Sequence, residues 1–317
     1  MGADSRTCAW FVRCHVSLTA LSPPMMMKRL FALLCLLLAC AAWAQPPVPL
    51  LWKVSDADSS LYLLGSMHLL TRDDYPLAPA VDAAFADSAR LVFEIDPQGA
   101  DPQRMAQAMV QNATRTDGKT LEQTLPAATW KSLQAYATAR GISVQSRQGY
   151  KPWFVALVVM MGESAAAGLD PTLGLDQHFM ARAATAGKAT AGLESAEAQI
   201  ALFDGMGARA QQEFLQEMLD DVPRFSSQMD MLHSAWRGAD EQALQRVGLQ
   251  DMRRDYPALF QSLYVARNRA WLPRLEALLR ESDHDNALVV VGALHLLGDE
   301  GLVRLLLQRG YRVQRLR

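Results

Sequence analysis

Two histidines, His68 and His295, follow matching apolar stretches near opposite ends of the sequence. The stretch Leu61-Tyr-Leu-Leu-Gly-Ser-Met-His68 aligns without a gap with Leu288-Val-Val-Val-Gly-Ala-Leu-His295, and glycine and histidine fall in register. Packing gives no reason to place the same polar ring after the same strand twice. We therefore expect both imidazoles to face one site, where they could bind a metal ion or transfer protons.

Two glutamates occupy comparable positions, Glu94 within an apolar stretch and Glu194 at the end of another. A buried, unpaired carboxylate is costly, so Glu94 should have a cation, a metal or a hydrogen-bond donor as its partner. Two neutral imidazoles and a carboxylate with an open fourth position would form a hydrolytic metal site. The alternative is that Arg267 or Arg269 pairs with the two glutamates.

The stretches that carry these side chains are typical of strands buried on both faces, which are usually parallel. Ligands of open parallel sheets gather beyond the carboxyl ends of the strands. We therefore expect four strand ends to present His, Glu, Glu and His at one edge. Gly65 and Gly292 lack a Cβ and would let another group approach closely.

The sequence as a whole predicts an α/β fold with a central, mostly parallel sheet and a large all-helical insertion at about 101–281. The apolar segment Trp153–Met161 is too short to cross a bilayer, and we expect it to form a core helix rather than a contact surface. The expected strands are 50–54, 61–65, 90–97, 188–194, the second Gly-x-x-His strand within 286–298, and 311–316. The expected helices include 79–88, 203–219, 225–236, 239–249, 257–279 and 299–308.

The N-terminal residues predict export. Residues 1–24 fit no targeting pattern and would be a non-native or untranslated extension, whereas 25–44 combine a basic start, an apolar centre and the cleavage site Ala42-Trp-Ala44 of a secretory signal peptide. Residues 45–317 would then form a single domain, periplasmic or secreted. In the alternative, Leu37-Leu-Ala-Cys40 resembles a lipobox, and a lipid anchor on Cys40 would make a membrane-anchored lipoprotein.

The net charge and the absence of one motif argue against some classes of binding partner and of enzyme. With 31 basic and 33 acidic residues the formal net charge is −2, so we expect no nucleic-acid partner, and no transmembrane helix is predicted. Gly-x-Ser-x-Gly is absent from the sequence, which argues against a serine hydrolase of the usual α/β type. The expected partner is a peptide or small-molecule substrate.

The chain resembles the TraB/GumN family over about residues 48–317. The resemblance is carried by the two Gly-x-x-His motifs together with Phe93-Glu94, Lys151-Pro-Trp153, Gly174-Leu-Asp176, Gly192-Leu-Glu194, Gln199 and Arg267-Asn268. That family includes the Tiki proteases and is similar in fold to erythromycin esterases and ChaN-like haem-binding proteins.

This resemblance implies a divalent-metal-dependent peptidase, with Mn2+ or Co2+ as the metal. It implies His68, Glu94 and His295 as metal ligands or, without a metal, as base and orienting groups. Arg267 would stabilise an oxyanion, Glu94 and Glu194 are further catalytic candidates, and Lys151, Arg267 and Asn268 are candidates for substrate binding.

Two other functions remain open at this point. The first is a non-catalytic protein that binds haem, metal or a small ligand, with Tyr62 or Met67 as an iron ligand. The second is a metal-free, esterase-like hydrolase with a histidine base.

Overall fold

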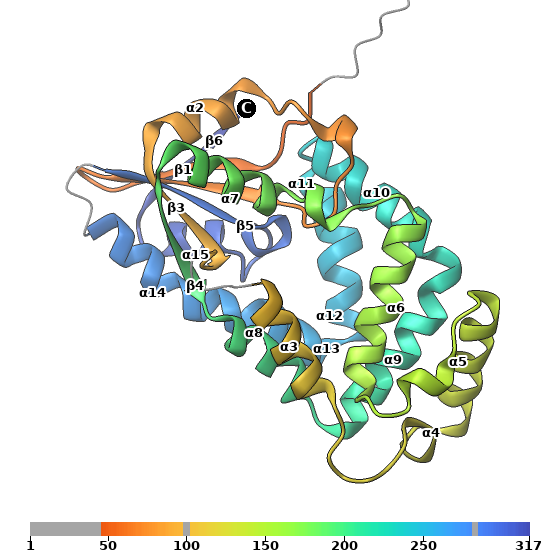
Figure 1. The fold of residues 1–317 in the computed structure, drawn as a ribbon. Helices are drawn as coiled ribbons and strands as arrows, with labels where there is room; N and C mark the ends of the chain where they lie inside the picture. The colour runs from red at the N-terminus through yellow and green to blue at the C-terminus, as the bar shows by residue number, and fades with distance from the viewer. Residues whose placement is uncertain (1–45, 98–101, 281–284) are drawn as a thin grey trace, which may run out of the picture. The chain divides into compact units, whose positions relative to one another are not determined.

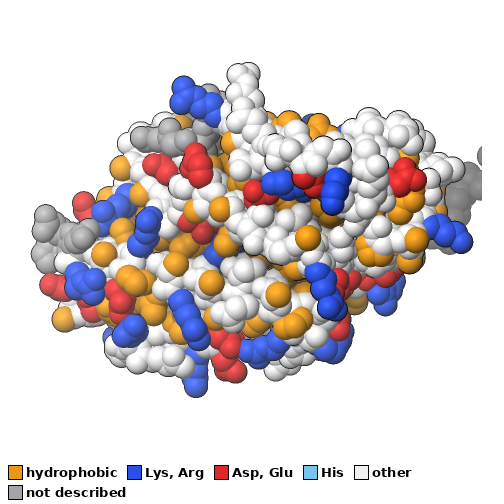
Figure 2. All heavy atoms as spheres, turned by 90° about the horizontal axis from the view of Figure 1, so that it is seen from below, with side chains coloured by type: hydrophobic (Ala, Val, Ile, Leu, Met, Phe, Trp, Pro, Cys, Tyr) orange, Lys and Arg blue, Asp and Glu red, His pale blue; other side chains and the backbone are white. Residues whose placement is uncertain are grey.

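The computed structural model describes residues 46–97, 102–280 and 285–317, and Pro46–Arg317 forms one compact unit. The predicted extension, the signal peptide and Cys40 lie outside the described residues. Within the described ranges, no helix is long and apolar enough to cross a bilayer. On the face drawn in Figure 2, basic and acidic side chains are interspersed with hydrophobic ones.

A six-stranded sheet in the order β4-β3-β5-β2-β1-β6 forms the centre of this unit (Figure 1). The strands β4, β3, β5 and β2 are parallel, whereas β1 is antiparallel to both of its neighbours, β2 and β6. The predicted α/β fold with a mostly parallel sheet is therefore confirmed. The strands are β1 (Leu51–Ser55), β2 (Ser60–Ser66), β3 (Ser88–Ile95), β4 (Ala189–Glu194), β5 (Asn286–Gly292) and β6 (Arg312–Leu316).

The two Gly-x-x-His strands, β2 and β5, are neighbours in the middle of the sheet, with Ser66 opposite Gly292. Their side chains are buried on both faces, as expected from two runs of uninterrupted apolar residues. The helices α2 (Pro79–Asp87) and α7 (Leu175–Ala186) pack against β3 and β5, and α14 (Arg267–Arg280) packs against β2 and β4. Both histidines consequently lie at the carboxyl edge of the sheet.

The helical insertion expected at about 101–281 is present, and it is interrupted once, by β4, at the strand that the sequence predicts at 188–194. The apolar stretch before Glu194, itself predicted as a strand, returns to the sheet and pairs with β3. The remaining helices are α3 (Pro102–Ala113), α4 (Leu121–Thr124), α5 (Ala127–Ala139), α6 (Pro152–Ala166), α8 (Ala196–Asp204), α9 (Ala208–Asp221), α10 (Phe225–Arg237), α11 (Glu241–Leu244), α12 (Asp251–Asp255), α13 (Pro257–Leu259) and α15 (Leu302–Gln308).

Three expected helices differ from the structure. The helix expected at 203–219 is divided at Gly205-Met-Gly207, because these glycines end α8 and precede α9. The helices expected at 239–249 and 257–279 each contain a π-helical segment, Gln245–Gln250 and Phe260–Ala266. The second of these segments ends directly before Arg267, and π-helical segments are frequent at functional sites.

A smaller hydrophobic core holds the insertion together, and α6 lies at its centre. Val155, Ala156 and Val159 of α6 are buried against Trp130 of α5 and Leu215 of α9. The apolar segment that begins at Trp153 is thus a core helix, as the sequence predicts.

The helix α10 is bonded directly to the segment around the first motif. Trp236 of α10 donates its indole N–H to the carbonyl oxygen of Gly65, at 2.9 Å. The fully buried carboxylate of Asp74 accepts hydrogen bonds from His233 at 2.8 Å, from Thr71 and from Arg237. Burial alone would raise the pKa of Asp74, but these hydrogen bonds hold it well below its usual range.

We predict that Asp74→Asn lowers the free energy of unfolding by about 3 kcal/mol near neutral pH, because it leaves the charge of Arg237 without its buried partner. Since the pKa of Asp74 is lower in the folded state, its contribution is complete above the unfolded pKa of about 3.9. The contribution disappears as the pH falls through the folded-state pKa. Urea unfolding of wild type and variant as a function of pH measures this difference.

The matched control is Asp58→Asn, on the exposed turn between β1 and β2. It should change stability by less than about 0.5 kcal/mol at every pH. If the difference in the free energy of unfolding between wild type and Asp74→Asn does not decrease at acidic pH, the carboxylate charge is not the stabilising feature.

Candidate functional site

His68 lies two residues beyond the end of β2, with 62% of its side-chain surface exposed. Its Nδ1 lies 2.6 Å from Oδ2 of Asp176, and the Ser66 hydroxyl donates to the same oxygen, also at 2.6 Å. Because a carboxylate accepts, Nδ1 carries the proton and Nε2 is left to face solvent or substrate. Asp176 raises the pKa of His68 above its ordinary value, although burial opposes this effect.

Asp176 is held beside His68 by a close backbone contact that requires Gly174. A Cβ atom at Gly174 would lie only 2.3 Å from the carbonyl oxygen of His68. The next amide, that of Leu175, donates to the carbonyl oxygen of Met67 at 3.0 Å. No role for Asp176 was predicted; its only signal in the sequence is its place at the end of Gly174-Leu-Asp176, at the start of a helix.

Glu94, on β3, is buried next to Gly292. Its Oε1 accepts the Gly292 amide at 2.8 Å. A Cβ atom at Gly292 would lie 3.3 Å from this oxygen, 3.5 Å from Cδ2 of His295 and 3.8 Å from Nε2 of His68. The structure thus brings both histidines and Glu94 together around one glycine at the carboxyl edge of the sheet.

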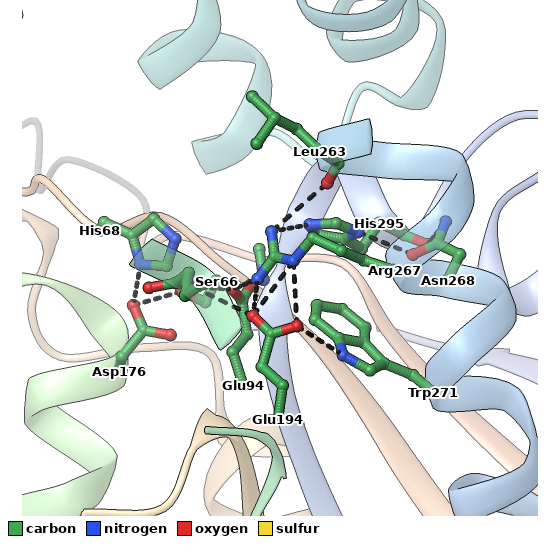
Figure 3. A network of polar contacts seen from close by, with 12 residues as sticks. Ser66, His68, Glu94, Asp176, Glu194, Leu263, Arg267, Asn268, Trp271 and His295 are labelled. Atoms are coloured by element: carbon green, nitrogen blue, oxygen red, sulfur yellow. Dashed lines mark hydrogen bonds and ion pairs between the residues drawn. The ribbon is translucent and has the colours of Figure 1, made fainter. Parts of the chain in front are cut away.

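Arg267, the first residue of α14, bridges the two glutamates (Figure 3). Its Nη2 lies 2.5 Å from Oε2 of Glu94 and 2.6 Å from Oε1 of Glu194. Glu194 is also bonded by the indole N–H of Trp271 at 3.1 Å and by the amide of Gln199 at 3.2 Å. The arginine pairing weighed above is therefore present.

The charges in this network stabilise one another. Burial raises the pKa of Glu94, but the charges of Arg267 and His68 and the hydrogen bond from the Gly292 amide outweigh it and lower this pKa to about 2. Burial lowers the pKa of Arg267, while the two glutamates raise it on balance. Glu94 and Arg267 are therefore ionised at neutral pH.

His295 is buried, with its ring against Trp271 at 4.6 Å and Tyr264 at 5.8 Å between centroids. Its Nδ1 lies 2.7 Å from Oδ1 of Asn268, whose amide group donates to the carbonyl oxygens of His295 and Glu300. Oδ1 must therefore accept, so that Nδ1 of His295 carries the proton. Burial lowers the pKa of His295 to about 3, and the neutral ring accepts from Nη1 of Arg267 at Nε2, at 3.1 Å.

Three further candidates, Lys151, Tyr62 and Met67, do not belong to the cluster around Arg267. Nζ of Lys151 pairs with Asp204 at 2.6 Å and ties the start of α6 to the end of α8, so its role in substrate binding stays a prediction. Tyr62 points away from the site, because its hydroxyl donates to Asp87 at the amino ends of the parallel strands. Tyr62 is consequently not a ligand for iron at this site, whereas Met67 is partly buried against the core.

The described residues offer no group of three His, Cys, Asp or Glu side chains arranged to hold a metal ion. Arg267 lies among the candidate ligands, and its guanidinium contacts both Oε2 of Glu94 and Nε2 of His295. These two atoms do not fit a divalent ion in this arrangement, because the ion would lie against a like charge. The expected Mn2+ or Co2+ stays a prediction that requires Arg267 to move.

A mostly parallel α/β sheet, with two related Gly-x-x-His strand ends beside paired carboxylates, defines the class of this protein. The chain belongs to the TraB/PrgY/gumN family, whose model matches residues 50–315. It is similar to the uncharacterized protein YbaP of Escherichia coli K12 and of Shigella flexneri. Each is 24% identical over 245 residues, which cover 77% of this chain and 87% of the relative. No solved structure matches the chain.

We predict that Gly174→Ala destabilises the protein by about 2 to 3 kcal/mol, because its methyl group would collide with the backbone of His68 and push α7 away. Urea unfolding measures the loss. Gly149→Ala is the matched control, since a Cβ there meets no atom within 4 Å. Equal stability of the two variants would contradict the close contact between α7 and the first motif.

Proposed function

We propose that the protein is an exported hydrolase that transfers an acyl group from a peptide to water at the site between His68 and Arg267. The observation that carries this proposal is the exposed Nε2 of His68, held in one tautomer by Asp176 and facing a cluster with a buried guanidinium. A positioned imidazole and a fixed cation are the two groups that hydrolysis of a carbonyl compound needs. The peptide class is taken from the resemblance to the Tiki proteases.

In the proposed reaction, His68 takes up one proton and later releases it, so the enzyme ends the cycle unchanged. His68 Nε2 takes a proton from water while the water oxygen bonds to the carbonyl carbon, and negative charge develops on the carbonyl oxygen. Collapse of this intermediate breaks the carbon–nitrogen bond, and His68 returns the proton to the leaving amine. Asp176 raises the pKa of His68 to about 10, which stabilises the imidazolium between these steps. At neutral pH only the unprotonated minority of the ring can start the reaction, so the rate should rise with pH towards that pKa.

Arg267 would stabilise the developing negative charge. Four of its N–H groups are directed at Glu94, Glu194 and His295, whereas the contact of Nη1 with the carbonyl oxygen of Leu263 is the longest, at 3.4 Å. An oxyanion that replaced the Leu263 carbonyl oxygen as the acceptor of this N–H would therefore cost the least in hydrogen bonding. The other bonds keep the guanidinium fixed, which is the preorganisation that electrostatic catalysis requires.

A second candidate is the metal-dependent form of the same hydrolysis, implied by the family resemblance. The observation in its favour is that Glu94 Oε1, the His295 ring and His68 Nε2 all lie within 3.8 Å of the position of a Gly292 Cβ. Peptide cleavage that a chelator abolishes and Mn2+ or Co2+ restores would select this candidate over the first.

Export is the remaining part of the proposal, and it rests on residues 25–44. We predict that the chain produced with these residues in a bacterial host is recovered from the periplasm and begins at Gln45. N-terminal mass spectrometry of the fractionated protein measures this. A lipid-modified Cys40 as the first residue would instead show anchoring to a membrane, and retention of residues 25–44 in the cytoplasm would contradict export.

We predict that His68→Ala lowers kcat/KM for peptide hydrolysis by about 100-fold to 10,000-fold, because the proton acceptor is lost. Asp176→Asn should lower it by about tenfold to 100-fold, since the base remains but loses its orienting carboxylate. Cleavage of a quenched fluorescent peptide library measures both effects.

The matched control is His178→Ala. His178 is also a histidine on this side of the fold, but it lies on α7 and stacks on Tyr75 at 4.5 Å. Its removal should leave kcat/KM unchanged. Full activity of His68→Ala would reject the proposed role of His68.

A further inference from the structure

The position of the cation in this site is filled by a side chain of the protein itself. We propose that the guanidinium of Arg267 takes the place of the divalent metal ion that the family resemblance implies. The inference rests on the proposed function for its chemistry, but the occupancy of the site can be measured without activity.

The first argument is that atoms which would ligate a metal already accept hydrogen bonds from Arg267. Of the implied ligands His68, Glu94 and His295, two offer a metal the lone pairs of Glu94 Oε2 and His295 Nε2. Both of these atoms accept from Arg267, at 2.5 and 3.1 Å, and the same guanidinium also donates to Glu194 Oε1 at 2.6 Å. Metal–ligand distances are about 2.0 to 2.2 Å, so an ion in contact with these atoms would occupy the volume of the guanidinium.

The second argument is the burial of the charges. The side chains of Arg267, Glu94 and Glu194 expose only 10%, 8% and 12% of their surface. Removing one partner from such a buried cluster leaves an uncompensated charge, which is strongly unfavourable. A planar guanidinium with five N–H donors can serve two carboxylates and an imidazole at once, which an ammonium group cannot.

The third argument is that the surrounding structure fixes Arg267 in place. Its guanidinium lies 4.6 Å from the ring centroid of Trp271, a cation–π contact that adds to the ion pairs. The π-helical segment Phe260–Ala266 ends immediately before it, and Leu263 of this segment offers its carbonyl oxygen. Arg267 thus starts α14 at the point where helix geometry changes, with its side chain directed into the sheet edge.

The two histidines of the repeated motif consequently have different tasks. His68 is exposed and keeps Nε2 for a substrate, whereas His295 is buried and uses Nε2 to accept from Arg267. Asn268 makes this possible, because it accepts the proton of Nδ1 and leaves the lone pair on Nε2. His295 and Asn268 are therefore positioning residues for the guanidinium.

The test is a calorimetric titration of the whole protein with Mn2+ and with Co2+, after treatment with chelator and dialysis. Wild type should show no stoichiometric binding tighter than about 1 mM. Arg267→Ala should bind one ion at least about tenfold more tightly, or should recover thermal stability in about 10 mM guanidinium chloride, which is far below denaturing concentrations. Either result shows that the emptied position accepts a cation.

Arg267→Lys is the second variant, for the case in which Arg267→Ala does not fold. It keeps one positive charge but cannot bridge both glutamates, so it should unfold at a lower temperature than wild type and still bind no metal. One-to-one binding of Mn2+ or Co2+ by Arg267→Lys tighter than about 1 mM would contradict the inference, because the remaining positive charge would then not exclude the ion.

One-to-one binding of Mn2+ or Co2+ by wild type, lost in His295→Ala, would overturn the inference. So would a folded Arg267→Ala variant that responds to neither metal nor guanidinium. If wild type cleaves no peptide, the proposed function fails, yet these titrations still decide whether Arg267 occupies the position of the metal.

Discussion

The interaction on which the site depends is the sharing of one guanidinium by two buried carboxylates at the ends of neighbouring strands. Glu94 and Glu194 are adjacent because β3 and β4 are parallel and in register, with Ile95 opposite Glu194. Two like charges at this position would be unfavourable without a cation between them. The chain meets this constraint by docking α14 across the sheet, so that Arg267 and Trp271 of one helix turn reach Glu194 together.

The same constraint gives the two Gly-x-x-His segments different environments, although their sequences are similar. Both Gly-x-x-His segments place an imidazole at the same edge, but the His295 ring contacts Trp271 and Asn268 of α14, whereas the His68 ring contacts Asp176 of α7. Burial there lowers the pKa of His295 and fixes it as a neutral acceptor, whereas Asp176 raises the pKa of His68 on the open side. Similar sequences thus give two imidazoles with opposite electrostatic character, and the difference comes from residues outside the repeat.

The residues outside the repeated motif that distinguish the two histidines could not be predicted from the sequence. The uninterrupted apolar character of β2 and β5 predicted strands buried on both faces, and the buried position of Glu94 predicted a charged or polar partner. Nothing in the local pattern indicated that Asp176, 108 positions from His68 along the chain, would fix its tautomer. The two π-helical segments and the break at Gly205 depend on tertiary packing and on glycine geometry, which periodicity alone does not reveal.

The bond from Trp236 to the carbonyl oxygen of Gly65 links the helical insertion to the strand that ends at the first motif. Three residues beyond that carbonyl, the backbone of His68 lies against Gly174 of the segment that begins α7. The short segment from Gly65 to His68 is thus attached to α10 and to the start of α7, so that a displacement of either helix would act directly on the backbone that carries this imidazole.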